Sequence, residues 1–314
     1  MEYRYCGNSG LQLPAISLGL WQNFGEADDA RAAAEMIVYA FDRGITHFDL
    51  ANNYGPPPGS AESNFGRILA RELKNRRDEM IISSKAGHRM WEGVYGDGGS
   101  RKSIMASLHQ SLKRTGLEYF DIFYSHRYDA QTPVEETVGA LADIVRQGKA
   151  LYAGISKYPA PRAEEAYRLM SAHGVPCVVH QDRYNLLHRA PEHSLFELNR
   201  RHGVGFVAFS PLAQGLLSGK YLNGVPEGSR IRKGLGFLQE KDLTPEVAQR
   251  VAVLQNLSRQ RGQPLSEMAL AWALRQEGVA SVIIGASGAS QIEMNLKALH
   301  SAGFSPEETA IIDG

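Results

Sequence analysis

The stretch Gly44-Ile-Thr-His-Phe-Asp-Leu-Ala-Asn-Asn-Tyr-Gly55 has the pattern of a short buried strand followed by a loop. Apolar residues alternate with polar or aromatic ones from residue 45 to residue 50, and Gly44 marks the turn before them. Asp49 stands at the strand end and Tyr54 in the loop. Catalytic groups of parallel α/β proteins lie at the carboxyl ends of strands, so this pair is a candidate acid and phenol of a catalytic site. The alternative is a capping aspartate and a packed tyrosine.

Strand-like and helix-like segments alternate along the whole chain, which indicates a parallel sheet. The predicted strands are 14–20, 45–50, 80–84, 119–125, 150–155, 176–180, 204–209 and 281–284. Eight such units in 314 residues without a break in composition favour a closed (β/α)8 TIM barrel over a doubly wound sheet. We therefore expect residues 1–314 to form one barrel domain, with an N-terminal β-hairpin at residues 3–13 and extra C-terminal helices. Residues 215–243 are too long for a simple connection and are expected to carry function.

The composition excludes several classes of protein. Lysine plus arginine equals aspartate plus glutamate, at 34 each, and without a basic patch neither nucleic acid nor an anionic membrane is an expected partner. The first residues lack the apolar core of a signal peptide, and no apolar run approaches about 18 residues. We therefore expect a cytoplasmic protein. Cys6 and Cys177 are interpreted as packing residues rather than as a disulfide framework.

Polar or ionisable side chains follow nearly every predicted strand, whereas the strand bodies are interpreted as apolar. In a barrel the carboxyl ends of all eight strands converge on one mouth, so these side chains are expected to share one pocket. The strand-end residues are Trp21, Asp49, Lys85, His126, Ser156, Gln181, Ser210 and Ser287.

Three of these side chains, together with Tyr54 from the loop, suit the interconversion of a carbonyl and an alcohol. A tyrosine has a pKa of about 10, and an adjacent ammonium such as Lys85 is expected to lower the pKa of Tyr54. Asp49 can pair with Lys85, and His126 can bind a substrate oxygen, which together makes a proton relay. His126 and His180 are far apart in the chain and lack further ligands at zinc spacing, so we expect no metal site.

These residues resemble the catalytic tetrad of the aldo-keto reductase superfamily, and the resemblance covers residues 4–311. Its most specific segments are Leu117-Glu-Tyr-Phe-Asp-Ile122, Ser210-Pro-Leu-Ala-Gln-Gly-Leu-Leu-Ser-Gly-Lys-Tyr221 and Ile284-Gly-Ala-Ser287. Residues 51–62 and 98–102 are most similar to the branch of bacterial L-glyceraldehyde 3-phosphate reductases. The β subunits of voltage-gated potassium channels are the next most similar branch.

The resemblance implies a nicotinamide dinucleotide, NADPH with NADH possible, lying across the barrel mouth without a Rossmann fold. By this resemblance Ser156 and Gln181 would hold the carboxamide, and Phe209 would stack on the nicotinamide ring. The residues implied around the pyrophosphate are Ser210, Pro211, Leu212, Gly215, Ser218 and Lys220, and those implied at the adenosine end are Arg230, Ser287, Gln291 and Asn295. Further implied cofactor contacts are Trp21, Asp49 and Gly285. The implied substrate residues are Trp21, Tyr54, Met90, Trp91, His126, Arg127 and Tyr128.

Several of these assignments have a simpler alternative. Met90 and Trp91 could be loop packing, Arg127 a solvated charge, and Phe209 a core residue. The sequence also departs from the superfamily at three places. Gly288 replaces a frequently basic residue, Met294 replaces a carboxylate that contacts the adenine, and the sequence stops at residue 314, before the usual C-terminal loop.

The expected function is NADPH-dependent reduction of small aldehydes or ketones, such as L-glyceraldehyde 3-phosphate or methylglyoxal-like compounds. Arg127, with Arg101 and Lys102 nearby, favours an anionic aldehyde. One alternative is a nucleotide-sensing interaction module like the channel β subunits, which usually lack a histidine matching His126. Another is a Schiff-base aldolase using Lys85, which leaves Tyr54 unexplained. The subunit count stays open, including a homo-oligomer.

Overall fold

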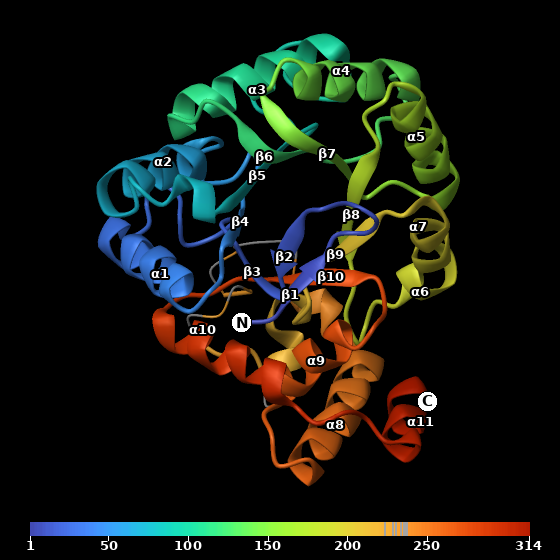
Figure 1. Ribbon diagram of the computed structural model, residues 1–314. Coiled ribbons are helices and arrows are strands. Elements are labelled where there is room, and N and C mark those ends of the chain that lie inside the picture. Colours follow the sequence, from blue (N-terminus) through green and yellow to red (C-terminus); the bar gives the residue numbers. More distant parts are fainter. Residues whose placement is uncertain (223, 228, 230, 233, 235–237) are drawn as a thin grey trace.

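The computed structural model describes residues 1–314 except 223, 228, 230, 233 and 235–237. In the described residues, eight parallel strands close into a barrel in the order β10-β3-β4-β5-β6-β7-β8-β9 (Figure 1). This confirms the predicted (β/α)8 barrel. The strands are β3 (Ile16–Gly19), β4 (His47–Asp49), β5 (Ile81–Ala86), β6 (Phe120–Ser125), β7 (Ala150–Ser156), β8 (Cys177–Arg183), β9 (Gly205–Phe209) and β10 (Val279–Ile284).

A ring of helices surrounds the barrel, and α8 and α11 extend beyond it on one side (Figure 1). The α-helices are α1 (Ala30–Asp42), α2 (Ser60–Glu72), α3 (Arg101–Thr115), α4 (Val134–Arg146), α5 (Ala160–Ala172), α6 (Ala190–Ser194), α7 (Phe196–His202), α8 (Pro245–Gln260), α9 (Leu265–Leu274), α10 (Ala289–Leu296) and α11 (Pro306–Asp313). Short 3₁₀ turns are η1 (Arg77–Glu79), η2 (Ala213–Ser218), η3 (Glu240–Asp242) and η4 (Lys297–His300). The short helix α6 and the turn η1 were not predicted. The long connection after β9 contains η2 and η3.

Helix α1 shows how local sequence sets an element and directs the next strand. The Asp29 carboxylate accepts hydrogen bonds from the amides of Arg31 and Ala32, which caps the first turn. Buried apolar residues recur at helical spacing on the face that packs on the barrel. The helix ends before Gly44, whose φ of +84° suits glycine and turns the chain into β4.

The N-terminal hairpin of β1 (Tyr3–Tyr5) and β2 (Gln12–Pro14) lies across one end of the barrel (Figure 1). Its turn approaches the backbone before β9 so closely that a Cβ on Gly7, at φ +59°, would lie 2.1 Å from the Gly203 carbonyl oxygen. Arg4 fixes the hairpin to the end of α9 and the start of β10 by donating to the carbonyls of Leu274, at 2.7 Å, and Val279, at 3.2 Å. The hairpin therefore covers the amino ends of the strands, and the carboxyl ends are left to form a site.

The strand bodies are not uniformly apolar, and that part of the prediction was wrong. Polar side chains on four neighbouring strands are fully buried and hydrogen-bond to one another inside the barrel: Ser17, His47, Ser83 and Ser281. Because each finds a polar partner there, the cost of burying it is offset. Both cysteines are buried and free, as predicted.

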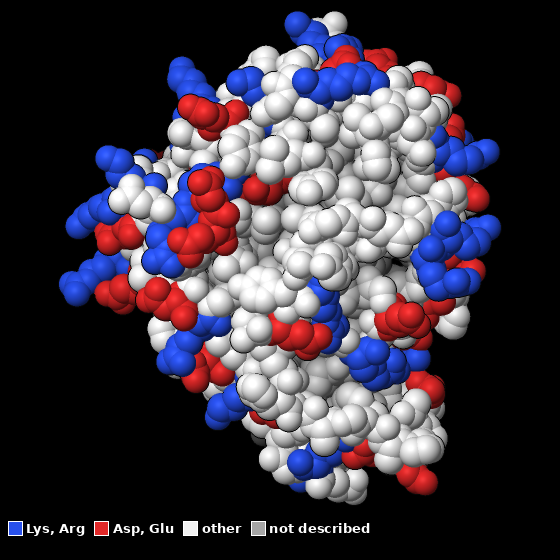
Figure 2. All heavy atoms as spheres, in the orientation of Figure 1, with Lys and Arg blue, Asp and Glu red and all other residues white. Residues whose placement is uncertain are grey.

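The face that carries the hairpin has an uncharged centre, and its charged side chains of both signs are mixed around the periphery (Figure 2). This mixture agrees with the balanced charge of the sequence. None of the helices in the described part of the chain is long and apolar enough to span a membrane.

Candidate active site

Lys85 hydrogen-bonds to two other members of the predicted tetrad, Asp49 and Tyr54. It lies on β5, two residues beyond the residue that pairs with Asp49 of β4. Its ammonium donates to Asp49 Oδ2 at 2.6 Å, to the Leu50 carbonyl at 2.6 Å and to the Tyr54 hydroxyl at 3.3 Å. The lysine is fully buried, so its three donors all have partners within the protein.

The charge of Lys85 is set by this environment. Desolvation alone would lower the pKa of the amine, but the Asp49 carboxylate and the Tyr54 hydroxyl outweigh it and raise the pKa. Lys85 therefore stays an ammonium ion. Asp49 is also held by Ser83, whose hydroxyl donates to Oδ1 at 2.7 Å, and by the Gln181 amide at 3.0 Å from the same oxygen.

The pKa of Tyr54 differs from the expectation. Burial raises it, the Lys85 ammonium opposes that rise, and the net direction is upward. The predicted lowering was therefore wrong in its net sign, because desolvation of the phenolate exceeds the effect of the adjacent charge. The phenol thus keeps its proton and is a donor in the resting protein.

His126 follows β6 directly, and its amide donates to the Ala86 carbonyl of β5 at 2.8 Å. Its ring lies edge-on to Tyr54, with the two ring centroids 5.9 Å apart. Burial and then the positive charge of Lys85 hold the pKa of His126 well below its usual range, so the imidazole is neutral. Its Nδ1 is buried without a hydrogen-bond partner among the described residues. A neutral ring beside the phenol can hydrogen-bond a ligand oxygen.

The buried polar side chains behind Asp49 were not predicted to belong to the site. Ser281 and Ser17 share a hydrogen bond of 2.6 Å, Ser17 contacts His47 Nδ1 at 2.8 Å, and His47 Nε2 contacts Ser83 at 3.0 Å. Ser83 then donates to Asp49. Strand periodicity could have found two of these residues, because residues two apart on a strand face the same side, as His47 and Asp49 or Ser83 and Lys85 do.

Two further residues at the mouth were missed. His88 lies beyond β5, with its ring centroid 4.5 Å from that of His126. Lys157 follows β7, and its Nζ lies 3.0 Å from His88 Nε2. The only signal in the sequence was that Lys157 comes directly after Ser156, a strand-end position.

The residues predicted to hold the nicotinamide lie on adjacent strand ends. Ser156 of β7 pairs in register with Gln181 of β8, and Phe209 ends β9 with a partly buried ring. The Ser156 hydroxyl is buried and lacks a partner among the described residues. An unpartnered hydroxyl beside an amide suits a carboxamide, which both donates and accepts hydrogen bonds.

The loop after β9 has an unusual backbone. Ser210, Ala213 and Gln214 are non-glycine residues at φ values of 52°, 46° and 57°, and Gly215 has φ 103°. A non-glycine residue in this left-handed conformation destabilises the fold by about 1–3 kcal/mol, and such residues concentrate at ligand sites. Of the residues predicted in this loop, Pro211 is buried and Leu212 is partly buried. Ser218 is exposed, and its hydroxyl donates to the Gly215 carbonyl. The Lys220 ammonium lies over the Tyr221 ring. Together these features fit a cofactor with an extended phosphate chain.

The predicted adenosine end lies at the start of α10. The Ser287 amide donates to the Gln291 side chain at 2.9 Å, Gly285 is exposed, and Asn295 is buried on the helix. No described side chain caps the first turn of α10, so its amides can bind an anion. Arg230 lies outside the described residues.

The predicted substrate residues surround the mouth unevenly. Trp21, Met90 and Trp91 are partly buried in loops, and Tyr128 stacks edge-on against Tyr158 with 5.6 Å between ring centroids.

The basic residues expected near Arg127 are engaged elsewhere. Arg127 donates to the Gly87 carbonyl and pairs with Asp97 at 2.9 Å. Arg101 is paired with Asp143 of α4 at 2.5 Å, and Lys102 lies over the Tyr95 ring. Arg101 and Lys102 were expected to add positive charge at the mouth. For Arg101 this expectation was wrong, because its charge is paired with that of Asp143.

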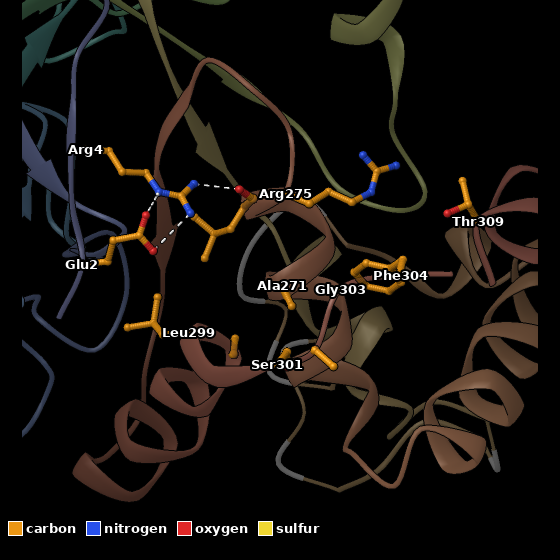
Figure 3. A pocket seen from close by; sticks show the side chains of 12 residues that line it. Glu2, Arg4, Ala271, Arg275, Leu299, Ser301, Gly303, Phe304 and Thr309 are labelled. Atoms are coloured by element: carbon orange, nitrogen blue, oxygen red, sulfur yellow. Dashed lines mark hydrogen bonds and ion pairs between the residues drawn. The ribbon is translucent and has the colours of Figure 1, made fainter. Parts of the chain in front are cut away.

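A pocket of about 490 Å³ lies away from this site, between the hairpin, α9 and the segment before α11 (Figure 3). Arg4 lines it and is held by Glu2 and by the Leu274 carbonyl. Since Arg4 also contacts Val279 at the start of β10, the pocket lies at the opposite end of the strands from Tyr54.

Comparison with known proteins bears on this geometry. The model of the Aldo/keto reductase family matches residues 15–314. The chain belongs to the aldo/keto reductase family. As an aldo/keto reductase it is an oxidoreductase, and members of the family act on small carbonyl substrates with NAD(P)H.

Relatives of this aldo/keto reductase carry two different names. It is 55% identical over 317 residues to L-glyceraldehyde 3-phosphate reductase of Escherichia coli O157:H7 and 54% identical to that of strain K12, covering 100% of this chain and 92% of each relative. It is 36% identical over 305 residues to a probable voltage-gated potassium channel subunit beta of Arabidopsis thaliana, covering 95% of this chain and 91% of the relative.

Proposed function

We propose that the protein is an NADPH-dependent reductase of small aldehydes in which Tyr54 is the general acid, with L-glyceraldehyde 3-phosphate as the leading substrate. The observation that carries the chemistry is the position of Lys85, 2.6 Å from Asp49 and 3.3 Å from the Tyr54 hydroxyl at one strand edge. The names of the relatives at 55% and 54% identity support the substrate.

The cofactor would be held by the residues that the family resemblance assigned. Ser156 and Gln181 would hold the carboxamide, and Phe209 would lie against the nicotinamide ring. The loop after β9 would hold the pyrophosphate, and Arg230 with the start of α10 would hold the adenosine end. Bound NADPH supplies the hydride that reduces the carbonyl carbon.

The chain's own residues would then supply the proton and position the substrate. The neutral His126 ring hydrogen-bonds the carbonyl oxygen beside the Tyr54 hydroxyl, which gives that oxygen its proton. The phenolate left on Tyr54 is stabilised by the Lys85 ammonium, which matters because burial disfavours the anion. Asp49 keeps Lys85 charged and in place.

The direct test is Tyr54→Phe, which removes the acid and little volume. Turnover of L-glyceraldehyde 3-phosphate should fall at least about a hundredfold, a typical loss for a general acid, while NADPH affinity, measured by fluorescence quenching, stays close to that of the wild type. Tyr119→Phe is the matched control, since Tyr119 precedes β6 and lies under the Arg77 guanidinium, 4.3 Å from it. Near-normal turnover in Tyr54→Phe would reject Tyr54 as the acid.

The alternative is a nucleotide-sensing interaction module, and the relative named as a channel subunit beta supports it. His126 beside Tyr54 favours the reductase, because the channel subunits usually lack that histidine. A panel of small aldehydes assayed by NADPH oxidation separates the two: tight NADPH binding without turnover of any aldehyde would favour the module. We also propose that residues 1–314 act as a single domain. The cytoplasmic location and a possible homo-oligomer stay predictions.

A further inference from the structure

Lys157 is a cation held in an unusual place. It directly follows β7, at a φ of 54°, which is a left-handed conformation for a residue with a side chain. Its Nζ lies 3.0 Å from His88 Nε2, and the ring of His88 packs edge-on against His126. The contacts Tyr54–His126, His126–His88 and His88–Lys157 thus lead from the proposed acid to this ammonium.

The charges around Lys157 do not balance. Lys85 is matched by Asp49 and Arg127 by Asp97. Lys157 forms no ion pair with a carboxylate anywhere in the described part of the chain, and the partner that the structure gives its ammonium is an imidazole.

This excess of positive charge helps to lower the pKa values of Lys157 and His88. Burial, then the charges of Lys85, Arg127 and Arg183, lower the pKa of Lys157 to about 8, and Asp182 only partly opposes them. Burial, then Lys157 and Arg127, lower the pKa of His88 to about 4. An anion bound here would relieve both.

We propose that Lys157 and His88 bind the phosphate of the substrate, at the end of a short aldehyde whose carbonyl lies between Tyr54 and His126. This inference rests on the proposed reductase function and names the residues that select a phosphorylated substrate. The ammonium is a point charge suited to phosphate oxygens. With Nε2 accepting from the Lys157 ammonium, the neutral His88 ring carries its proton on Nδ1, which is then the donor for a phosphate oxygen.

The first test compares kcat/KM for L-glyceraldehyde 3-phosphate with that for L-glyceraldehyde. Lys157→Met should lower this ratio about tenfold to hundredfold, the effect of one charge-assisted hydrogen bond, and Lys157→Arg should keep most of it. Both variants keep an unbranched side chain at the left-handed position, so backbone strain is matched. Lys113→Met, on the exposed side of α3, removes the same charge elsewhere and should leave the ratio as in the wild type.

The second test does not depend on turnover. Glycerol 3-phosphate is titrated into the NADPH-loaded enzyme by calorimetry at pH 8, where the cofactor fills its own phosphate sites and no reduction can follow. Binding should be accompanied by proton uptake at Lys157, because its pKa of about 8 leaves part of this lysine unprotonated in the free enzyme at this pH. Lys157→Met should bind at least about tenfold more weakly and lose that uptake.

The outcomes separate this inference from the proposed function. If the wild type prefers the phosphorylated aldehyde and Lys157→Met keeps both the preference and the affinity for glycerol 3-phosphate, the inference is overturned and the reductase stands. If the wild type reduces aldehydes without any preference for the phosphorylated one, the phosphate site is rejected as well as that substrate. If no aldehyde is reduced, the proposed function fails.

Discussion

The Ser83 hydroxyl donates a 2.7 Å hydrogen bond to Asp49 Oδ1, the carboxylate oxygen opposite the one that Lys85 contacts. Both carboxylate oxygens of Asp49 are therefore held by residues of β5, one by Ser83 and the other by Lys85. Ser83 is in turn hydrogen-bonded to His47, so the orientation of Asp49 depends on polar residues deep inside the barrel.

Replacing Ser83 tests this support. Ser83→Ala removes a donor from Asp49 and leaves His47 Nε2 without its partner, so the free energy of unfolding should fall by about 1–3 kcal/mol and kcat should fall several-fold. Ser84→Ala is the matched control, because Ser84 is the next residue, is equally buried and donates to Glu62 instead. Urea unfolding and steady-state kinetics on both variants decide it. Equal kinetic effects in both would contradict a role for Ser83 in holding Asp49.

The buried pair of Asp49 and Lys85 should behave as a functional rather than a stabilising element. Lys85→Met leaves a buried carboxylate without its cation, which should destabilise the fold by about 3–5 kcal/mol. The double variant Asp49→Leu with Lys85→Met removes both charges and should recover most of that stability while staying inactive. Chemical denaturation of the wild type, of the single variants Lys85→Met and Asp49→Leu, and of the double variant gives the coupling free energy between the two residues. A double variant less stable than Lys85→Met would show that the ion pair itself stabilises the barrel.

Stability should fall in mild acid because of buried neutral histidines. Burial lowers the pKa of His47 to about 4 and that of His180 to about 3. Between the unfolded value of about 6.5 and these values, the unfolded chain binds more protons, so stability falls as pH falls. From pH 7.5 to pH 5 each histidine should remove about 2 kcal/mol. Urea unfolding at several pH values in this range measures how steeply the free energy of unfolding depends on pH. His180→Asn should make this dependence less steep, and an unchanged dependence would show that His180 does not contribute to it.

Cofactor preference should respond to Gly288. The backbone there is extended, with φ 177°, and a Cβ would meet no atom within 4 Å, so a side chain fits without strain. Gly288→Arg should strengthen NADPH binding relative to NADH by up to about tenfold, through a charge-assisted contact with the 2′-phosphate. Gly288→Met adds bulk without charge and should not change the ratio. Fluorescence titration with both cofactors measures it, and equal effects of the two substitutions would place the 2′-phosphate elsewhere.

The sequence predicted the barrel and the position of the tetrad for one physical reason. Strand ends converge in a parallel barrel, so Asp49, Lys85 and His126 could be brought together without knowing any contact. It did not predict the support from Ser83 and His47, because hydrogen bonds between polar residues inside the barrel depend on the pairing of strands far apart in the sequence. The predicted lowering of the Tyr54 pKa was wrong for a related reason, because the extent to which the phenol is desolvated depends on the packed structure.

The hairpin that covers the barrel also bears on how the chain folds as it is synthesised. The Cys6 thiol reaches the Val178 carbonyl and Arg4 reaches those of Leu274 and Val279, across separations of 172, 270 and 275 residues. The hairpin leaves the ribosome long before these partners exist. Its docking can therefore be completed only when nearly all of the barrel has been translated, and contacts of such long range form slowly. The first-made segment is thus among the last to reach its final place.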